Sequence, residues 1–425
     1  MKTYEWAIVG SGIAGISIAE ILTRQGHSAV LIEKNETLAS ETTRAFHEWL
    51  HTGALYTLVP DRLITLRFIL GAIDDLIEFY SSYDRMNLIP TETGLIINKE
   101  SPGWFEDNYI HFKYRVKGRK ITFPWIYGVA RSIYLIERIH QHDWLRRRAG
   151  ELNHFKERRA QRIRTLIQEL LISHESFRTV QTSDFTINSR LLLRDMVTTA
   201  ISNGLEISLD NKIEKIEKHR NYKLLSGSKE NIQAKNVALC SGEGIKYFST
   251  VETKTSYAPI AIVSGVTKHS KSFVELDYFT KNCINLLTKE NGFGLAGGIS
   301  LSDRLKCDEY LDYVVQKHKK IEPEMKEMSR YVGVKTEMTF KNQPRGYLYH
   351  IVNIEDGVWA MIPGKFTLAF SMAPEFYRRV YNHNPKKYFE TISDNKNSSN
   401  IVSNTIWMDT LIKFGKGRNG NDQIT

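Results

Sequence analysis

Residues Tyr4 to Glu33 read YEWAIVGSGIAGISIAEILTRQGHSAVLIE, and this stretch sets the class of the fold. Its first six residues form an apolar, partly β-branched run, which predicts a buried strand. Helix-compatible spacing follows from Ile13 to Arg24, then a turn at Gln25–His27 and a second apolar run at Ser28–Ile32. A strand, a glycine-rich loop, a helix and a second strand together predict a dinucleotide-binding βαβ unit.

The glycines of this loop have separate physical roles. Gly10 allows a tight turn out of the strand, Gly12 lets the backbone approach a pyrophosphate, and Gly15 lets the helix and strand pack closely. The positive N-terminus of the helix is expected to hold the phosphates, and Glu33 is placed to accept hydrogen bonds from the ribose hydroxyls. The predicted phosphate-binding residues are Gly10, Gly12, Ile13, Ala14 and Gly15.

Such a unit binds either FAD or NAD, and the segments that follow favour FAD. Residues Ala39–Arg44 read ASETTR, and Trp49–Tyr56 read WLHTGALY. Both resemble the D-amino-acid-oxidase-like FAD-dependent oxidoreductases, a group that includes glycine oxidase and glycerol-3-phosphate dehydrogenase. In that family a Ser/Thr-rich turn is followed by a His-x-Gly element against the flavin. HTGALY is particularly similar to the branch that oxidises L-2-hydroxyglutarate.

Two later segments extend the resemblance. Asn236–Gly244 (NVALCSGEG) is similar to the family's apolar strand and Ala-x-Gly turn, and Trp359–Thr367 (WAMIPGKFT) to its final strand and FAD loop. A helix from about Ala373 to Tyr381 is expected next, because Pro374 suits a first helical position. Its positive end would face the flavin pyrimidine. Beyond the glycine loop, the resemblance implies FAD contacts at Glu33, Lys34, Ser40, Thr42, Thr43, Ile213, Ser241, Gly242, Gly364, Lys365, Phe366 and Thr367.

The chain of 425 residues is long enough for two domains. The predicted fold class is α/β, with a Rossmann-like FAD-binding domain and an inserted α+β substrate domain built on a mixed sheet. The FAD-binding domain is expected at 1–83, 180–251 and 332–392, and the covering domain at 84–179 and 252–331. Residues 393–425 read as a flexible tail around an apolar island at Ile406–Met408 that could dock on the core. Expected strands of the covering domain are Thr91–Asn98, Pro259–Thr267 and Asn282–Leu287.

Three residues are candidates for the chemistry. His51 is placed beside the flavin by the resemblance, and an imidazole titrates near neutrality, so it suits proton handling. Packing against the flavin is the alternative role for His51. Arg345 offers a guanidinium fork for a carboxylate or phosphate, and a surface ion pair is its alternative. Tyr347 is expected in the pocket wall or the core.

The expected reaction is hydride transfer to the flavin from a small anionic hydroxy acid or polyol phosphate. The alternatives are an amino-acid or amine oxidase, and an FAD protein that acts on a macromolecule such as tRNA. Oxygen or a quinone would reoxidise the flavin. The three cysteines match no metal-site spacing, so no metal is expected.

Charge and composition set the remaining expectations. The chain has 41% hydrophobic residues, a net charge of +10 and no apolar run of membrane-spanning length, and its first residues lack a secretory signal. We therefore expect a cytoplasmic protein. Leu145–Arg164 holds eight basic residues against two acidic ones, which suits a solvated helix face or a weak contact with the inner face of a membrane. Nucleic acid is less expected, because aromatic and basic residues are not interleaved there.

Overall fold

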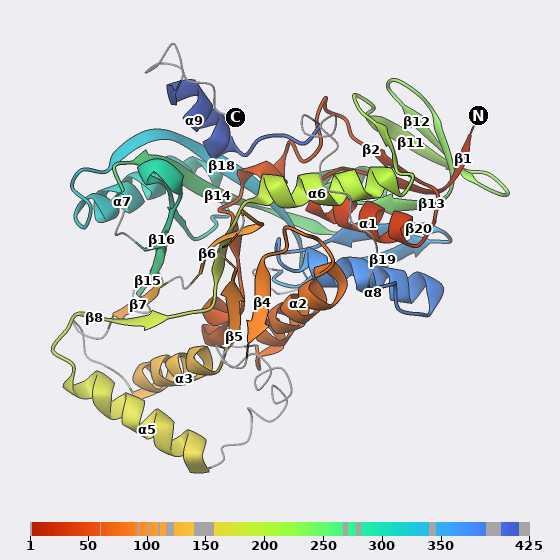
Figure 1. Cartoon of the computed structure of the whole chain (residues 1–425). Coiled ribbons are helices and arrows are strands. Elements are labelled where there is room, and N and C mark those ends of the chain that lie inside the picture. Colours follow the sequence, from red (N-terminus) through yellow and green to blue (C-terminus); the bar gives the residue numbers. More distant parts are fainter. Residues whose placement is uncertain are drawn as a thin grey trace.

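The computed structural model describes residues 2–59, 61–91, 94–98, 100, 102–108, 111–115, 123–139, 157–266, 271–277, 282–339, 346–387 and 401–415. Two large sheets organise these residues, and helices pack against each of them (Figure 1). None of the described helices combines the length and the apolar character that a membrane crossing requires.

The first sheet is built around the N-terminal βαβ unit. Its strand order is β10-β2-β1-β13-β12-β11, with β20 also paired to β13 and β19 paired to β20. Pairing is parallel from β10 to β13 and between β13 and β20, whereas β11, β12 and β19 join antiparallel. The strands are β1 (Thr3–Val9), β2 (Ala29–Ile32), β10 (Glu206–Ser208), β11 (Ile213–Lys218), β12 (Lys223–Gly227), β13 (Ile232–Leu239), β19 (His350–Glu355) and β20 (Val358–Ile362).

Alternation along β1 explains why both faces of this sheet are buried. Trp6 and Ile8 lie in a core shared with helices of the chain, whereas Ala7 and Val9 lie in a second core on the opposite face. A strand buried on both sides must be apolar, as β1 is from Trp6 to Val9. The helices on the first face are α1 (Ile13–Arg24), α6 (Ser189–Ser202) and α8 (Ala369–Tyr381).

The second sheet has seven strands in the order β18-β14-β17-β16-β15-β7-β8. Only the β15–β7 pair is parallel, so the sheet is mixed. The strands are β7 (His111–Arg115), β8 (Phe177–Gln181), β14 (Thr253–Ser264), β15 (Phe273–Asp277), β16 (Asn282–Thr288), β17 (Phe293–Gly298) and β18 (Lys326–Met338). Helices α2 (Ile64–Tyr80), α3 (Phe123–Ile139) and α5 (Glu157–Ile172) share a core with one face, and α7 (Cys307–Lys319) packs on the other.

Small elements connect the two large sheets. They are the three-stranded sheet of β3 (Trp49–Leu50), β9 (Phe185–Ile187) and β6 (Phe105–Asn108), the hairpin of β4 (Leu88–Thr91) and β5 (Gly94–Ile97), and α9 (Ile406–Gly415). Single 3₁₀ turns are η1 (Thr42–Ala45), η2 (Ala54–Leu58), η4 (Gly242–Tyr247), η5 (Glu290–Gly292) and η6 (Arg304–Lys306).

The predicted class is confirmed: a Rossmann-like sheet is accompanied by a separate mixed sheet. The predicted strands at Pro259–Thr267 and Asn282–Leu287 correspond to β14 and β16. Thr91–Asn98 instead overlaps the separate β4–β5 hairpin, which pairs with neither large sheet. The predicted domain boundary at residue 332 falls inside β18, because β18 pairs with β14 along its whole length.

Two expectations near the C-terminus differ from the structure. Helix α8 begins at Ala369, so Pro374 lies inside the helix and not at its first position. Pro374 has no N–H, so the Phe370 carbonyl one turn earlier loses its usual helical donor. Residues 401–415, assigned to a flexible tail, form a bridge at Val402 and helix α9, and Trp407 is buried in the core.

The basic stretch is described only from residue 157, where α5 begins, and 145–156 lie outside the described residues. Helix α5 has a buried apolar face, with Ile163 and Leu166 in the core shared with α3. Arg162 pairs with Glu137 of α3 at 2.6 Å. Part of the positive charge of this stretch is therefore engaged within the helix pair.

Candidate functional site

The glycine loop lies between β1 and α1 and is packed too closely for side chains. Gly10 has a φ of +99°, and a Cβ there would stand 2.8 Å from the Cys240 carbonyl oxygen. A Cβ on Gly15 would stand 1.8 Å from the carbonyl oxygen of Gly10. The loop is thus pressed against the end of β13 on one side and against the first turn of α1 on the other.

Thr43 joins the loop from η1, in the predicted Ser/Thr-rich turn. Its hydroxyl accepts a hydrogen bond of 3.0 Å from the Ile13 N–H, in the first turn of α1. A Cβ on Gly12 would lie 3.1 Å from the same oxygen. Because the first N–H groups of a helix have no partner inside the helix, this end of α1, with Ala14 next in line, is suited to phosphate oxygens.

Glu33 is buried and organises the loop from the end of β2. One carboxylate oxygen accepts from the Ser11 N–H at 3.1 Å and from the Ser11 hydroxyl, and the other accepts from the Asn35 N–H at 3.1 Å and its amide group. These four bonds match the acceptor capacity of a carboxylate. Sequence reasoning assigned Glu33 to a ribose and missed Ser11 and Asn35. Polar residues next to the acid and inside the loop were the available signal.

The other predicted residues of this region have partners within the chain. Lys34 pairs with Glu41 at 3.0 Å, and the Ser40 hydroxyl accepts from Asn35 at 2.7 Å. The Thr42 hydroxyl donates to the Val334 carbonyl of β18 at 2.6 Å and thereby links the turn to the second sheet. Ile213 is buried at the start of β11, two residues after Asn211, whose N–H donates to the Glu33 carbonyl at 2.9 Å.

Two further loops border the same region. Ser241 and Gly242 follow β13, and the Ser241 hydroxyl is buried without a hydrogen-bond partner among the described residues. Gly364 has a φ of +66°, and a Cβ there would stand 2.4 Å from the Leu348 carbonyl oxygen. Beyond it, Phe366 stacks on Phe46 with ring centroids 4.4 Å apart. The loop before α8 therefore packs directly on the segment that follows η1.

The histidine segment reaches this loop through a backbone contact. The His51 N–H donates to the Thr367 hydroxyl at 3.2 Å. Buried Asp184 holds the Trp49–Thr52 segment in place. Its carboxylate accepts hydrogen bonds from the Trp49 indole N–H at 2.9 Å and from both the N–H and the hydroxyl of Thr52. The His51 Nδ1 lies 3.8 Å from Asp184, too far for a hydrogen bond. No pattern in the sequence had marked Asp184.

The surroundings of both histidines favour the neutral imidazole. Burial lowers the pKa of His51, and Lys365 and Lys335 lower it further against the opposing effect of Asp184. Burial together with Lys335, His51 and Lys365 lowers the pKa of His47 to about 3. The Nε2 of His47 and the Nδ1 of His51 are buried and make no hydrogen bond with the described residues.

Aromatic rings and a lysine line the region beside His51. Tyr56 meets His51 edge to face with centroids 5.3 Å apart, and Tyr347 meets Tyr56 in the same way at 6.0 Å. Lys365 Nζ lies 5.1 Å from the centre of the Tyr347 ring, so the final FAD loop and the predicted pocket wall are in contact. Arg345 lies outside the described residues.

The arrangement fits FAD. Phosphate-binding features, at the α1 N-terminus and Thr43, continue through η1 and Phe46 to the histidines and the loop before α8. Among the described residues, buried polar atoms without partners occur at Ser241 and His47, where a polar ligand could satisfy them. In this arrangement the glycine loop would hold the pyrophosphate, and residues 47–51 and 364–367 would hold the flavin ring.

Comparison with known proteins agrees with this assignment. The family model described as DAO, FAD dependent oxidoreductase, matches residues 5–260. Dithionite-reduced L-alpha-glycerophosphate oxidase from Mycoplasma pneumoniae, with FAD bound, is 16% identical, with 91% of this chain and 97% of that chain covered and a TM-score of 0.62. Glycine oxidase from Geobacillus kaustophilus is 13% identical, with 92% and 100% covered and a TM-score of 0.61.

A third solved structure, L-proline dehydrogenase from P. horikoshii, is 12% identical, with 91% and 95% covered and a TM-score of 0.60. At such identities the likeness to solved structures shows the fold. No curated protein sequence matches the chain.

Proposed function

The chain belongs to the DAO family of FAD-dependent oxidoreductases, and on this basis we propose that it oxidises a small anionic substrate bearing a hydroxyl group. The charges around His51 carry this proposal. The charged groups that act on its imidazole include two lysines, Lys335 and Lys365, and one carboxylate, Asp184, and we infer that the two ammonium groups attract an anionic substrate. A hydroxy acid or a polyol phosphate would supply the matching negative charge.

The neutral state of His51 favours an alcohol as the reacting group. Bound FAD supplies the acceptor for the hydride that leaves the substrate carbon. The hydroxyl proton must leave at the same time, and a neutral imidazole can accept it. Because Nδ1 faces the Asp184 carboxylate, we assign the ring proton to Nδ1 and the role of proton acceptor to Nε2.

The second sheet and the aromatic wall would position the substrate. Lys335 extends from β18, where its Nζ lies 3.5 Å from the Ser300 hydroxyl. We assign Lys335 to the substrate's anionic group and Tyr347, with Tyr56, to the wall beside the reacting carbon. Arg345, one residue before the described segment that carries Tyr347, remains a proposed second contact for a carboxylate.

Reduction of the bound flavin tests this proposal. Purified holoprotein is mixed without oxygen with separate hydroxy acids, polyol phosphates, amino acids and uncharged polyols, and loss of the visible flavin absorbance is followed. We expect an anionic hydroxyl compound to bleach the flavin fastest. Bleaching by amino acids alone would assign the protein to the amine-oxidising relatives, and equal rates with uncharged polyols would remove the role given to the lysines. Reoxidation by oxygen or by a quinone analogue then identifies the electron acceptor.

A further inference from the structure

Glu48 lies between His47 and Trp49 in an unusual backbone conformation. Its φ is +55°, in the left-handed region that residues with side chains rarely adopt. Only 1% of the residue is exposed. Such a conformation persists only where surrounding contacts hold it, so the contacts of Glu48 decide how its two neighbours are presented.

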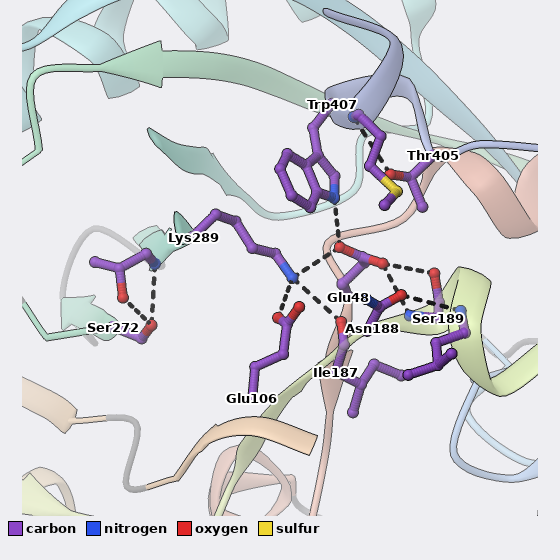
Figure 2. A network of polar contacts seen from close by, with 12 residues as sticks. Glu48, Glu106, Ile187, Asn188, Ser189, Ser272, Lys289, Thr405 and Trp407 are labelled. Atoms are coloured by element: carbon purple, nitrogen blue, oxygen red, sulfur yellow. Dashed lines mark hydrogen bonds and ion pairs between the residues drawn. The ribbon is translucent and has the colours of Figure 1, made fainter. Parts of the chain in front are cut away.

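Four groups hold the Glu48 carboxylate, as Figure 2 shows. One oxygen accepts from the Ser189 N–H at 3.0 Å and the Ser189 hydroxyl at 2.6 Å, at the start of α6. The other accepts from the Lys289 ammonium at 2.7 Å and from the Trp407 indole N–H at 2.5 Å. Helix α6, the end of β16 and α9 thus converge on one buried carboxylate.

The cation of this network is itself fully engaged. Lys289 also contacts Glu106 at 2.7 Å, and its side chain is 1% exposed. Burial alone would lower the pKa of Lys289, but Glu106 and Glu48 reverse that effect and raise it. Lys289 therefore stays charged, and the two carboxylates and the Ile187 carbonyl accept from its ammonium group.

Helix α9 brings Trp407 to Glu48. Residues 401–409 contact both ends of the segment 38–44, which contains the predicted Ser/Thr-rich FAD turn. Upstream, Leu38 forms a parallel bridge with Val402. Downstream, Asp409 pairs with Arg44 of η1. Residues 37–48, which include the predicted FAD contacts Ser40, Thr42 and Thr43, are therefore fastened along one side by residues 401–409.

We propose that Trp407 is a positioning residue for the flavin site. Its indole N–H fixes the Glu48 carboxylate, and the resulting turn at Glu48 directs His47 and the Trp49–His51 segment toward the isoalloxazine ring. As with the proposed function, this role requires that the flavin lies against residues 47–51. Helix α9 then supports the cofactor site through Glu48.

The substitution Trp407→Phe tests the proposal, because it keeps a smaller aromatic ring in the core and removes the indole N–H donor. Apoprotein is titrated with FAD, and the visible circular dichroism of the bound flavin is recorded. We expect the dissociation constant to rise about tenfold, in the range of one lost hydrogen bond to a charged group, and the visible dichroism to change shape.

Thr410→Val is the matched control on the same helix. The Thr410 hydroxyl donates to the Ile406 carbonyl and lies 3.3 Å from the Ser329 hydroxyl, away from Glu48. This variant should lose thermal stability without any change in FAD affinity or dichroism. If Trp407→Phe also changes only the melting temperature, Trp407 is merely structural and the proposal is wrong.

Two more variants remove ambiguity. If Trp407→Phe does not fold, Asp409→Asn weakens the other anchor of α9 at a largely exposed position, and it should shift the dichroism in the same direction. An unchanged spectrum there would overturn the proposal. His51→Asn tests the premise: if it alters the dichroism while the α9 variants do not, the flavin lies as proposed and only the role of Trp407 fails.

Discussion

At the scale of single residues, position 12 requires glycine because there is no room for a side chain, and not because of backbone strain. Its φ of −65° is open to any residue. A Cβ would however stand 3.1 Å from the Thr43 hydroxyl, which accepts from the Ile13 N–H. A larger side chain must displace this hydroxyl and also occupy the approach to the α1 N-terminus, where the phosphates are expected.

We therefore expect Gly12→Val to lower FAD occupancy at least about tenfold, while the melting temperature of the apoprotein changes by no more than about 3 °C. The ratio of flavin to protein absorbance after purification measures the occupancy. Gly71→Ala in α2, where a Cβ meets nothing within 4 Å, is the control and should retain full occupancy. Full occupancy in the valine variant would show that the phosphates bind elsewhere.

Lys335 gives a second prediction at this scale, concerning pH. The pKa of His51 is lowered from its ordinary 6.5, so the neutral base persists below that pH, and activity falls only as the pH drops through the lowered pKa. Removing a neighbouring cation raises this pKa. Lys335→Gln should therefore move the acid limb of kcat/KM to higher pH and raise KM for an anionic substrate about tenfold.

Lys326→Gln is the matched control, because Lys326 is exposed at the start of the same strand. It should change neither the KM nor the pH profile. If the acid limb of kcat/KM does not move in Lys335→Gln, Lys335 does not act on the proton-accepting group.

At the scale of elements, the sequence predicted the bounds of α1 correctly and the start of α8 wrongly. The start of α6 is fixed by Asn188, whose side chain accepts from the Leu191 N–H at 3.0 Å. The start of α8 was misplaced by four residues, because Pro374 was treated as a first-turn residue. Burial of residues such as Phe370 and Phe376 on one side of α8 outweighs the loss of one helical hydrogen bond at this proline.

The cap of α6 supplies the prediction at this scale. Asn188→Ala should lower the free energy of unfolding by about 1 kcal/mol, since an unpaired N–H remains at the helix start. Urea denaturation measures this change. Asn203→Ala at the other end of the helix, where the side chain is exposed, should have little effect. Equal losses in the two variants would contradict a specific role for the cap.

At the scale of the whole molecule, the net charge of +10 favours binding to anionic surfaces. Such binding arises either from the basic stretch 145–164 or from the charge of the chain as a whole. We expect weak binding to anionic vesicles that disappears at physiological salt, where the Debye length is about 8 Å. The triple replacement of Arg146, Arg147 and Arg148 by Gln should abolish this binding and leave turnover of a small substrate unchanged.

In the control variant, three exposed lysines of the first domain are replaced by neutral residues, so its net charge changes as much as in the arginine variant. These lysines are Lys215, Lys218 and Lys229. Binding lost to the same extent in both variants would point to global charge. Loss of turnover in the arginine variant would place the basic stretch in the active site.

The sequence alone determined the βαβ unit and the FAD-binding class, because these depend on local patterns. Glycine spacing, an apolar strand and an acid at its end are all contained in thirty consecutive residues. The same holds for the strand before Ser241 and the loop around Gly364, which the family resemblance identified.

Only the tertiary structure decided which distant residues act together. Asp184 reaches His51 and Trp49 across more than 130 positions, and Trp407 reaches Glu48 across 359. A buried carboxylate selects partners by proximity and desolvation, and neither leaves a periodic signal in the chain. Lys335 likewise becomes part of the histidine cluster only because β18 pairs with β14 and places it there.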